Sequence, residues 1–336
     1  MALSRLGEFG IIERIKNVFA SQGSDVQTGI GDDAAVFKTL PGYWTVITTD
    51  ALIEGVHFDL SYTPVESVGW KLIAVNISDI AAMGAVPRTA VVTLALTDKW
   101  SRKHIDLLVR GIADCCKQYD CDLIGGDTVR SMNSAFFSAT ITGEVEPECC
   151  VKRSGAEIGD LICVTGVLGR SKAGLQFLSS FSKEEKNEKA VNHFLYPSPR
   201  VKEARFLVKE ADINAMIDIS DGLASEIHHI CTSSEKGCII YGNKIPVAEE
   251  VKNFSAKKNK PAFFEALQSG EEYELLFTLS ENSFKKLKEK HVYNNDLISV
   301  IGEITDKTEG IHLLYDRKKV TLPTKGWDHF KTGKHY

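Results

Sequence analysis

The stretch GIGDDAAVF, residues 29–37, places two adjacent aspartates, Asp32 and Asp33, on a glycine-rich turn. The stretch VITTDALIEGVHF, residues 46–58, then adds Asp50. The chain has no loop of the form G-x-x-x-x-G-K-[ST], so a nucleotide would have to be held without the lysine of a phosphate-binding loop. The fold must therefore place these carboxylates where some other group compensates their charge.

The composition is typical of a globular protein. The chain has 336 residues, 43% of them hydrophobic and 25% charged, with a net charge of −5; it is long enough for two domains with cores. The lack of a basic block argues against a nucleic-acid partner, and no apolar run is long enough to cross a membrane. The N-terminal MALSRLGEFGIIERI is typical of an amphipathic helix rather than a signal peptide, so we expect a cytoplasmic protein. Eight cysteines without a C-x-x-C spacing indicate structural roles.

The hydrophobic pattern predicts a mixed α/β protein. In the first half, strands are expected at 43–49, 89–96, 123–124 and 135–145, and helices from 63 to 83 and from 101 to 119. Thr63 and Glu66 have the spacing of a capping box, and Gly84 suits the end of that helix. The second half predicts strands at 215–219, 273–279, 298–304 and 311–315, with helices after 220 and at 283–290. The pattern changes near Val151, which predicts two domains, 1–150 and 151–336.

Further aspartates recur along the chain. Asp79 lies on an apolar helix, Asp127 follows two glycines, and Asp218 and Asp221 flank the junction of a strand and a helix. A carboxylate in apolar surroundings is costly unless a cation pairs with it, and ligands gather where the strands of α/β sheets end. Magnesium prefers such oxygen ligands and bridges them to phosphates, so the set predicts a magnesium cluster that holds a polyphosphate. N-capping explains Asp33, Asp127 or Asp221 about as well when each is considered alone, but not Asp79 or Asp218.

Seven motifs extend along the chain in the order GIGDDAAV, TTDALIEGVHF, AVNISDIAAMGAVP, LIGGDTVRS, RSGAEIGD, IDISDGL and GEEYELLFT. Together they resemble the thiamine-monophosphate kinase family, over nearly the whole chain from GEFGIIERI to GWDHF. Several are shared with the wider superfamily of aminoimidazole ribonucleotide synthetase and selenophosphate synthetase. The helix motif with Asp79 and the runs IDISDGL and GEEYELLFT are closer to the kinase branch. In one departure, Glu272 stands where the family usually has aspartate.

The resemblance implies a fold and an activity. The fold would be an aminoimidazole ribonucleotide synthetase-like architecture of two α/β domains, whose N-terminal domains pair in a homodimer with ATP near the pairing. The activity would be transfer of the γ-phosphate of ATP to the phosphate of thiamine monophosphate, which gives thiamine diphosphate and ADP. The C-terminal domain would complete the active site.

The resemblance also implies roles for residues at matching positions of this chain. Several Mg²⁺ ions would be held by Asp33, Thr48, Thr49, Asp50, Asp79, Asp127, Asp218 and Asp221. ATP would be bound by Gly126, Asp127, Arg153 and Ser220, and thiamine monophosphate by His57, Glu271 and Trp327. An arginine fork matches phosphate oxygens, and a tryptophan face with a carboxylate suits the thiazolium cation.

The implied mechanism is direct in-line transfer, with no covalent nucleophile and no general base. The acceptor phosphate is already largely ionised at neutral pH, since its second pKa is near ~6. Metal ions would screen the repulsion between two anionic groups. The observation that the chain offers many aspartates and no evident nucleophile agrees with this scheme.

Two alternative functions are weighed. Another ATP-using enzyme of the superfamily is one: selenophosphate synthetases normally need a reactive cysteine near the N-terminus, and this chain has none before Cys115. Hydrogenase-maturation proteins normally end on cysteine, whereas this chain ends KTGKHY. The other alternative is a catalytically silent nucleotide-binding protein, which has no reason to keep so many unpaired carboxylates.

Overall fold

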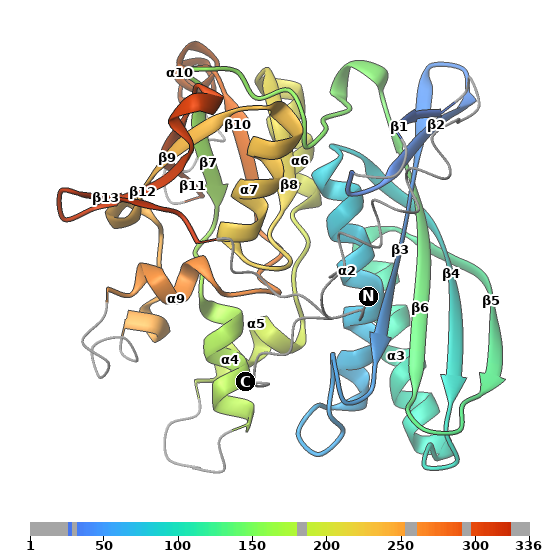
Figure 1. The fold of residues 1–336 in the computed structure, drawn as a ribbon. Helices are drawn as coiled ribbons and strands as arrows, with labels where there is room; N and C mark the ends of the chain where they lie inside the picture. Colours follow the sequence, from blue (N-terminus) through green and yellow to red (C-terminus); the bar gives the residue numbers. More distant parts are fainter. Residues whose placement is uncertain (1–25, 29–31, 180–186, 253–260, 291–296, 324–336) are drawn as a thin grey trace, which may run out of the picture.

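The structure is a computed structural model, and it describes residues 26–28, 32–179, 187–252, 261–290 and 297–323. Each half of the chain builds one sheet, and helices lie between the two sheets (Figure 1). The predicted α/β class with mixed sheets is confirmed. The proposed domain boundary at residue 150 stays a prediction, although the first sheet ends with Val145 and the second begins with Leu161.

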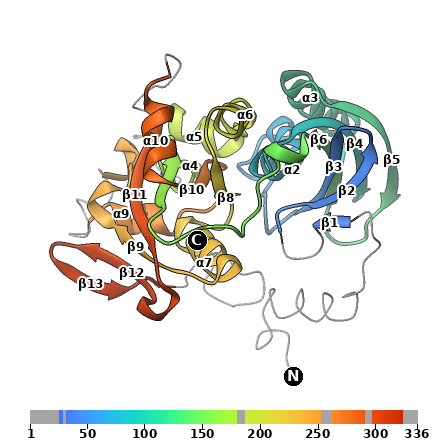
Figure 2. The same ribbon diagram turned by 90° about the horizontal axis from the view of Figure 1, so that it is seen from above.

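Within the described residues, the N-terminal half forms a six-stranded sheet in the order β1-β2-β3-β6-β4-β5, in which only β4 and β5 pair in parallel. Its strands are β1 (Val26–Thr28), β2 (Ala35–Leu40), β3 (Tyr43–Ile53), β4 (Val86–Leu96), β5 (Asp122–Arg130) and β6 (Phe136–Val145). Its helices are α2 (Val65–Ala82) and α3 (Arg102–Tyr119), which cover one face of the sheet (Figure 2).

The C-terminal half forms a seven-stranded sheet in the order β13-β12-β9-β11-β7-β10-β8. Its strands are β7 (Leu161–Thr165), β8 (Ile213–Asp218), β9 (Gly237–Tyr241), β10 (Leu275–Leu279), β11 (Ile298–Thr305), β12 (Ile311–Tyr315) and β13 (Lys318–Thr321). Its helices are α4 (Arg170–Ser179), α5 (Glu188–Leu195), α6 (Val201–Glu210), α7 (Leu223–Ser234), α9 (Phe263–Leu267) and α10 (Glu281–Lys288).

Helix α2 lies between the first sheet and the C-terminal half (Figure 1), where it contacts β3, β6, α6 and β8. Its residues are apolar on nearly every side, as expected for a helix that neighbours cover all round. Two glycines allow α3 to approach closely: a Cβ at Gly69 would lie 2.1 Å from the Leu108 carbonyl oxygen, and one at Gly111 would lie 1.9 Å from that of Glu66. The polar side chains of α2 therefore lie against the first sheet, α3 or the C-terminal half.

Three local predictions differ from the structure. Thr63 does not cap α2, because its hydroxyl accepts the Asp59 amide at 3.3 Å, and Glu66 pairs with Arg110 instead of closing a capping box. Strand β5 does not stop at Gly125-Gly126 but continues through Asp127, because its pairing with β4 resumes at Gly125 after a register shift and runs to Arg130. Asp50 lies within β3 rather than at its end, because β3 pairs with β6 as far as Ile53.

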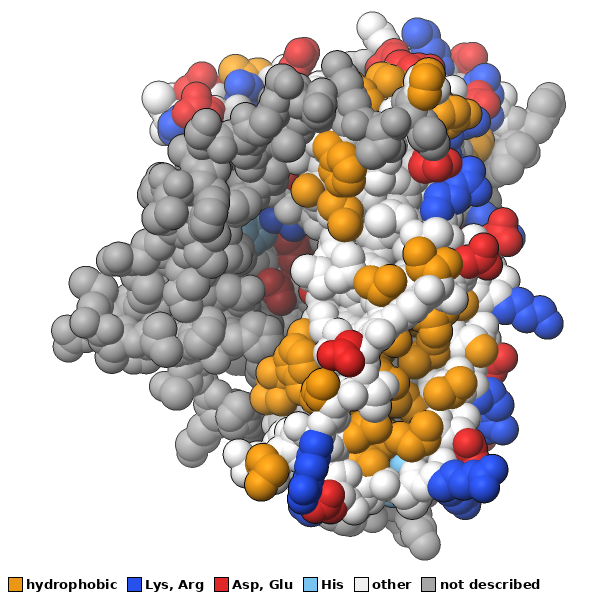
Figure 3. Space-filling view, turned by 90° about the vertical axis from the view of Figure 1, so that its right-hand side faces the viewer, with side chains coloured by type: hydrophobic (Ala, Val, Ile, Leu, Met, Phe, Trp, Pro, Cys, Tyr) orange, Lys and Arg blue, Asp and Glu red, His pale blue; other side chains and the backbone are white. Residues whose placement is uncertain are grey.

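The face of the first sheet opposite α2 and α3 points outward (Figure 2), and apolar side chains gather on it (Figure 3). Ile124 is 66% exposed, and Val129 and Val91 are also exposed. Exposed apolar patches are frequent at protein–protein interfaces. Within the ranges that the structure describes, no helix combines the length and apolarity needed to span a bilayer.

Candidate active site

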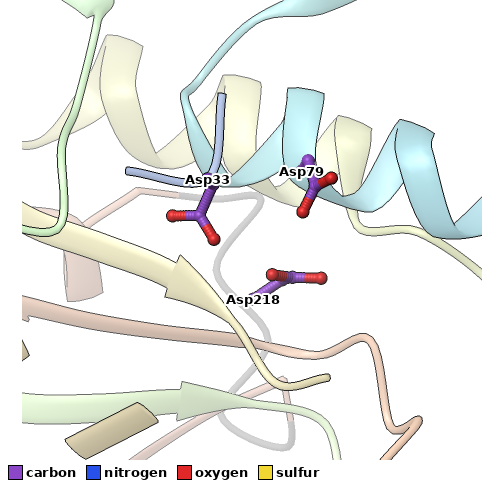
Figure 4. Close-up of side chains that lie close together, drawn as sticks. All are labelled: Asp33, Asp79 and Asp218. Carbon is purple, nitrogen blue, oxygen red and sulfur yellow. The ribbon is translucent and has the colours of Figure 1, made fainter. Parts of the chain in front are cut away.

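Three aspartates from distant parts of the chain converge between the two halves (Figure 4). Asp33 precedes β2, Asp79 is in α2, and Asp218 is the last residue of β8; each offers a carboxylate oxygen, and these oxygens lie within 4.8 Å of one another. Both halves thus contribute to one cluster, which we call the three-aspartate cluster. Such spacing matches a shared divalent cation rather than three independent caps.

Two buried hydroxyls hold the cluster in place. The Thr48 hydroxyl on β3 donates to Asp79 Oδ2 at 2.7 Å, and the Ser78 hydroxyl on α2 donates to Asp218 Oδ2 at 2.6 Å. Ser78 was not identified from the sequence, although it directly precedes Asp79 in the motif NISD. Its bond connects α2 to β8 and so fixes the carboxylates of two different halves relative to each other.

The electrostatics of the cluster favour a bound cation. The pKa of Asp79 is raised well above its usual range, first by burial and then by the charges of Asp50 and Asp218. The pKa of Asp218 is raised to about 8, mainly by burial and then by the charge of Asp33. Burial and nearby negative charges both disfavour the ionised carboxylate, and a cation bound between the carboxylates would offset them. The donor atoms are all oxygens, which suits Mg²⁺.

Metal-free protein should lose stability as the pH rises from about 4 to about 8. The pKa of Asp218 is raised from 3.8 to about 8 in the folded state. Between these values the unfolded chain has released a proton that the folded protein still binds, so the free energy of unfolding falls with rising pH. Melting curves recorded in a chelator across this range measure the slope. Asp218→Asn should flatten it, and an unchanged slope in that variant would contradict the assignment.

Arg153 lies at one side of the cluster. Its Nε and Nη2 donate to Asp33 at 2.8 and 2.6 Å, and its backbone amide donates to Asp32 Oδ1 at 3.3 Å. The pKa of Asp32 is raised to about 6, first by burial and then by the charge of Asp33. The guanidinium therefore compensates part of the negative charge at Asp33. Its predicted role at the ATP phosphates is not tested by this contact and stays a prediction.

The turn after β8 carries Ser220 and Asp221. The Asp221 amide donates to Oε1 of Glu226 at 3.0 Å, and the Ser220 carbonyl accepts the Glu271 amide at 2.6 Å. Glu226 is buried in the first turn of α7, and its pKa is raised well above the usual range by burial and by Asp221 and Asp218. This glutamate was not identified from the sequence, because a first-turn glutamate is an ordinary helix feature. Asp221 lies outside the three-aspartate cluster.

Strand β3 sends its predicted ligands to both faces of the sheet. Thr48 points toward α2, whereas the Thr49 hydroxyl donates to the Ala139 carbonyl at 3.0 Å and accepts from Thr140 at 2.9 Å. Asp50 shares the side of Thr48 by strand alternation, and its charge raises the pKa values of Asp79 and Asp218. Asp50 is thus within electrostatic reach of the cluster, and the Thr49 side chain is not part of it.

Within one copy of the chain, Gly126 and Asp127 lie far from the three-aspartate cluster. Asp50 pairs with Ala139, Ala139 with Val92, and Val92 with Gly126, which places Gly126 three strands from Asp50. Three strand spacings amount to roughly 14 Å. Asp127 is exposed on β5, at the edge of the sheet. A Cβ at Gly126 would lie 2.1 Å from the Val92 carbonyl oxygen, so close strand pairing also requires glycine here.

The predicted acceptor residues are placed as follows. Glu271 binds Lys71 of α2 with both carboxylate oxygens, at 3.0 and 3.1 Å. His57, in the turn after β3, accepts the Ile53 amide through Nδ1 at 3.0 Å. Trp327 lies outside the described residues. Lys71 was not identified from the sequence, because its partner Glu271 is 200 residues away in the chain.

Glu272, the departure from the family pattern, points away from the cluster. It is buried, and its Oε1 accepts the amides of Gly169 and Ser171 at 2.8 and 3.2 Å and the Ser269 hydroxyl. The carboxylate therefore caps the N-terminus of α4. Glu272 thus stabilises the start of α4.

Family models cover most of the chain. Residues 31–145 match the AIR synthase related protein, N-terminal domain, and residues 157–314 match the AIR synthase related protein, C-terminal domain. Solved structures of the hydrogenase maturation protein HypE are similar with TM-scores of 0.68 to 0.70. Their sequence identity to this chain is 17 to 20%, which supports a shared fold and nothing further.

Similar proteins with a kinase name cover nearly the full length. Thiamine-monophosphate kinase of Bacillus subtilis (strain 168) is 35% identical over 92% of this chain and 95% of the relative. That of Buchnera aphidicola subsp. Acyrthosiphon pisum is 38% identical over 96% and 98%. A solved structure described as "AaThiL complexed with AMPPCP and TMP" has a TM-score of 0.84 at 35% identity, covering 98% of this chain and 99% of that one. This chain therefore belongs to the thiamine-monophosphate kinase family.

Proposed function

We propose that this protein transfers the γ-phosphate of ATP to the phosphate of thiamine monophosphate, giving thiamine diphosphate and ADP. The observation that carries the proposal is the three-aspartate cluster, in which Asp33, Asp79 and Asp218 come from three of the motifs that mark the family and meet between the two halves. The related structure with AMPPCP and TMP, which matches this chain over nearly its whole length, supports the same pair of substrates.

The residues of the cluster fit magnesium. Asp33, Asp79 and Asp218 would hold it, with Asp50 close by, and Thr48 and Ser78 orient two of these carboxylates through their hydroxyls. Bound Mg²⁺ supplies charge neutralisation between two anionic phosphate groups and alignment of the transferred group. Burial and then the charges of neighbouring aspartates raise the pKa values of Asp79 and Asp218, and a bound cation would offset both effects.

The side chains around the cluster position the substrates. Arg153 presents a guanidinium beside Asp33, where it can move to a phosphate oxygen, and Ser220 lies in the turn after β8. No residue is assigned as nucleophile or general base, because the acceptor phosphate is largely ionised at neutral pH with a second pKa near ~6. Transfer is then direct, and positioning with charge compensation accounts for the acceleration.

The ring end of the acceptor is recognised at a distance from the three-aspartate cluster. Glu271 offers a carboxylate to the thiazolium cation, and His57 and Trp327 complete the set on the basis of the family positions. Glu271 is joined to the phosphate end of the site by its backbone, since its amide donates to the Ser220 carbonyl at 2.6 Å. A substrate with a ring cation at one end and a phosphate at the other suits this arrangement.

The active form is proposed to be a homodimer formed through the outward face of the first sheet. The exposed apolar side chains Ile124 and Val129 lie on β5, together with the predicted ATP residues Gly126 and Asp127. Asp127 lies about three strands from Asp50 in its own chain, so it would join a site only where a second copy covers β5. The apolar patch and the position of Asp127 thus point to the same interface.

The test of the function is an assay with purified protein, Mg²⁺, thiamine monophosphate and ATP labelled in the γ-phosphate. Label should appear in thiamine diphosphate and not in the protein after denaturation, as direct transfer requires. Free thiamine and an aminoimidazole precursor serve as control acceptors, and a chelator should abolish product. Failure to form thiamine diphosphate, with labelled product from another acceptor, would assign a different branch of the superfamily.

A further inference from the structure

Lys71 is a buried lysine on a helix that is otherwise packed on nearly all sides. Its side chain is 6% exposed, and its ammonium donates to Oε1 and Oε2 of Glu271 at 3.0 and 3.1 Å. The same ammonium lies 3.8 Å from the ring centroid of Phe194 on α5. Lys71 belongs to the N-terminal half, and both of its partners belong to the C-terminal half.

The position of this ion pair is not explained by stability alone. Removing a lysine from water costs free energy that an ion pair recovers only with good geometry, and apolar side chains of similar volume often stabilise as well. A methionine at position 71 could fill the same space between α2 and α5. The ion pair therefore points to a need for a fixed carboxylate at Glu271.

Glu271 is held from two directions. Its backbone has a positive φ of 57°, which non-glycine residues rarely adopt, and its amide is bonded to Ser220 in the turn of the candidate site. Lys71 then fixes the side chain. A backbone constraint and an ion pair on the same residue leave its carboxylate few orientations.

Helix α2 carries both ends of the proposed site. Lys71 and Asp79 are eight residues apart on this helix, which corresponds to about 12 Å along its axis. Tyr62 lies near the Lys71 end, because it packs against the hydrophobic cluster that contains Phe194. Aromatic faces and one carboxylate lie at this end, whereas the other end holds the three-aspartate cluster with the Arg153 guanidinium beside it.

We propose that Lys71 is a positioning residue for the acceptor substrate. Through its ion pair with Glu271 it orients the carboxylate that receives the ring cation of thiamine monophosphate, and it takes no part in binding ATP. This inference rests on the proposed function, because it assigns Glu271 to the acceptor. If the ion pair were only structural, its loss would lower stability without changing the KM for thiamine monophosphate more than the KM for ATP.

The first test is Lys71→Met, which keeps the apolar stem and removes the charge. The KM for thiamine monophosphate should rise about tenfold, while kcat and the KM for ATP should stay within about twofold of wild type. Lys71→Arg should restore most of the affinity for the acceptor, since it keeps a cation within reach of Glu271. If Lys71→Met does not fold, as circular dichroism would show, Lys71→Gln serves in its place.

Glu271→Gln and the double variant test whether Lys71 acts through Glu271. The double variant should have a KM for thiamine monophosphate no higher than Glu271→Gln alone, because the two residues act as a unit. Arg205→Met is the matched control: Arg205 also joins the two halves, by a 2.6 Å ion pair to Glu146, and its side chain is 15% exposed. Arg205→Met should lower the melting temperature, but it should not raise the KM for thiamine monophosphate more than the KM for ATP.

Three results would overturn the inference: equal increases in both KM values, additive effects in the double variant, or a KM split in Arg205→Met. The failure of the proposed function looks different, because wild-type protein would then form no thiamine diphosphate at all. Isothermal titration of thiamine monophosphate into wild type and Lys71→Met, without ATP, gives the same comparison without turnover.

Discussion

Asp218→Asn should lower kcat/KM for thiamine monophosphate by about a thousandfold, because it removes a carboxylate from the three-aspartate cluster and with it several kcal/mol of transition-state charge compensation. The same variant should melt at a higher temperature than wild type in the presence of a chelator at pH 8. Asp218 is buried, and its pKa is raised to about 8 by burial and by Asp33, so wild type without metal has an uncompensated charge there. Product formation and melting curves with and without Mg²⁺ measure both effects.

Asp160→Asn is the matched control for this variant. Asp160 is also buried in the C-terminal half, but its oxygens accept from the Asn214 amide at 2.9 and 3.0 Å and from the Glu157 amide at 2.9 Å. Its replacement should lower the melting temperature and leave kcat within about twofold of wild type. Wild-type turnover in Asp218→Asn would show that Asp218 has no role in the reaction. Equal stability losses in both variants would contradict the uncompensated charge at Asp218.

Asp127→Asn should also remove most turnover. Activity should return in a heterodimer that contains one Asp127→Asn chain and one Asp218→Asn chain. If Asp127 enters the site of a second copy, a heterodimer of the two variants has one site with both aspartates intact and one with neither. Its activity should then be about half that of wild type, although each variant alone is nearly inactive. Co-expression with two different affinity tags, followed by purification on both, isolates this heterodimer.

The same experiment distinguishes the possible places of Asp127. If Asp127 acts within its own chain, both sites of the heterodimer lack one aspartate and no activity returns. A monomer at all concentrations in size-exclusion chromatography would contradict the interface altogether. Ile124→Asp offers an independent check, because Ile124 is 66% exposed and a charge there should weaken the dimer while leaving the fold of each chain unchanged.

Regular elements were predictable wherever a local period was strong. The strand expected at 135–145 and the helix expected at 101–119 are found as β6 and α3, with Ser101 as N-cap. The predictions that differ depend on partners outside the segment. Thr63 and Glu66 had the spacing of a capping box, but Asp59 and Arg110 provide the bonds that these side chains make. Strand β5 continues through its glycines because β4 pairs with it.

The candidate site was predictable as a set of residue types but not as a geometry. The sequence singled out Asp79 and Asp218, because neither residue is at a position where it could cap a helix. It did not separate Thr48, whose hydroxyl binds Asp79, from Thr49, whose hydroxyl faces the other side of the sheet. It also gave no sign of Ser78 or Lys71, because their partners are about 140 and 200 residues away in the chain.

By itself the sequence determined the α/β class, the family and the acidic composition of the site, since these follow from periodicity within short segments and from motifs of adjacent residues. Only the tertiary structure decided which oxygens meet, that Asp33 is partly compensated by Arg153, and that Asp127 lies on an outward edge. The physical reason is that strand order and the packing of α2 between the halves depend on the burial of both cores together, and no single segment contains that information.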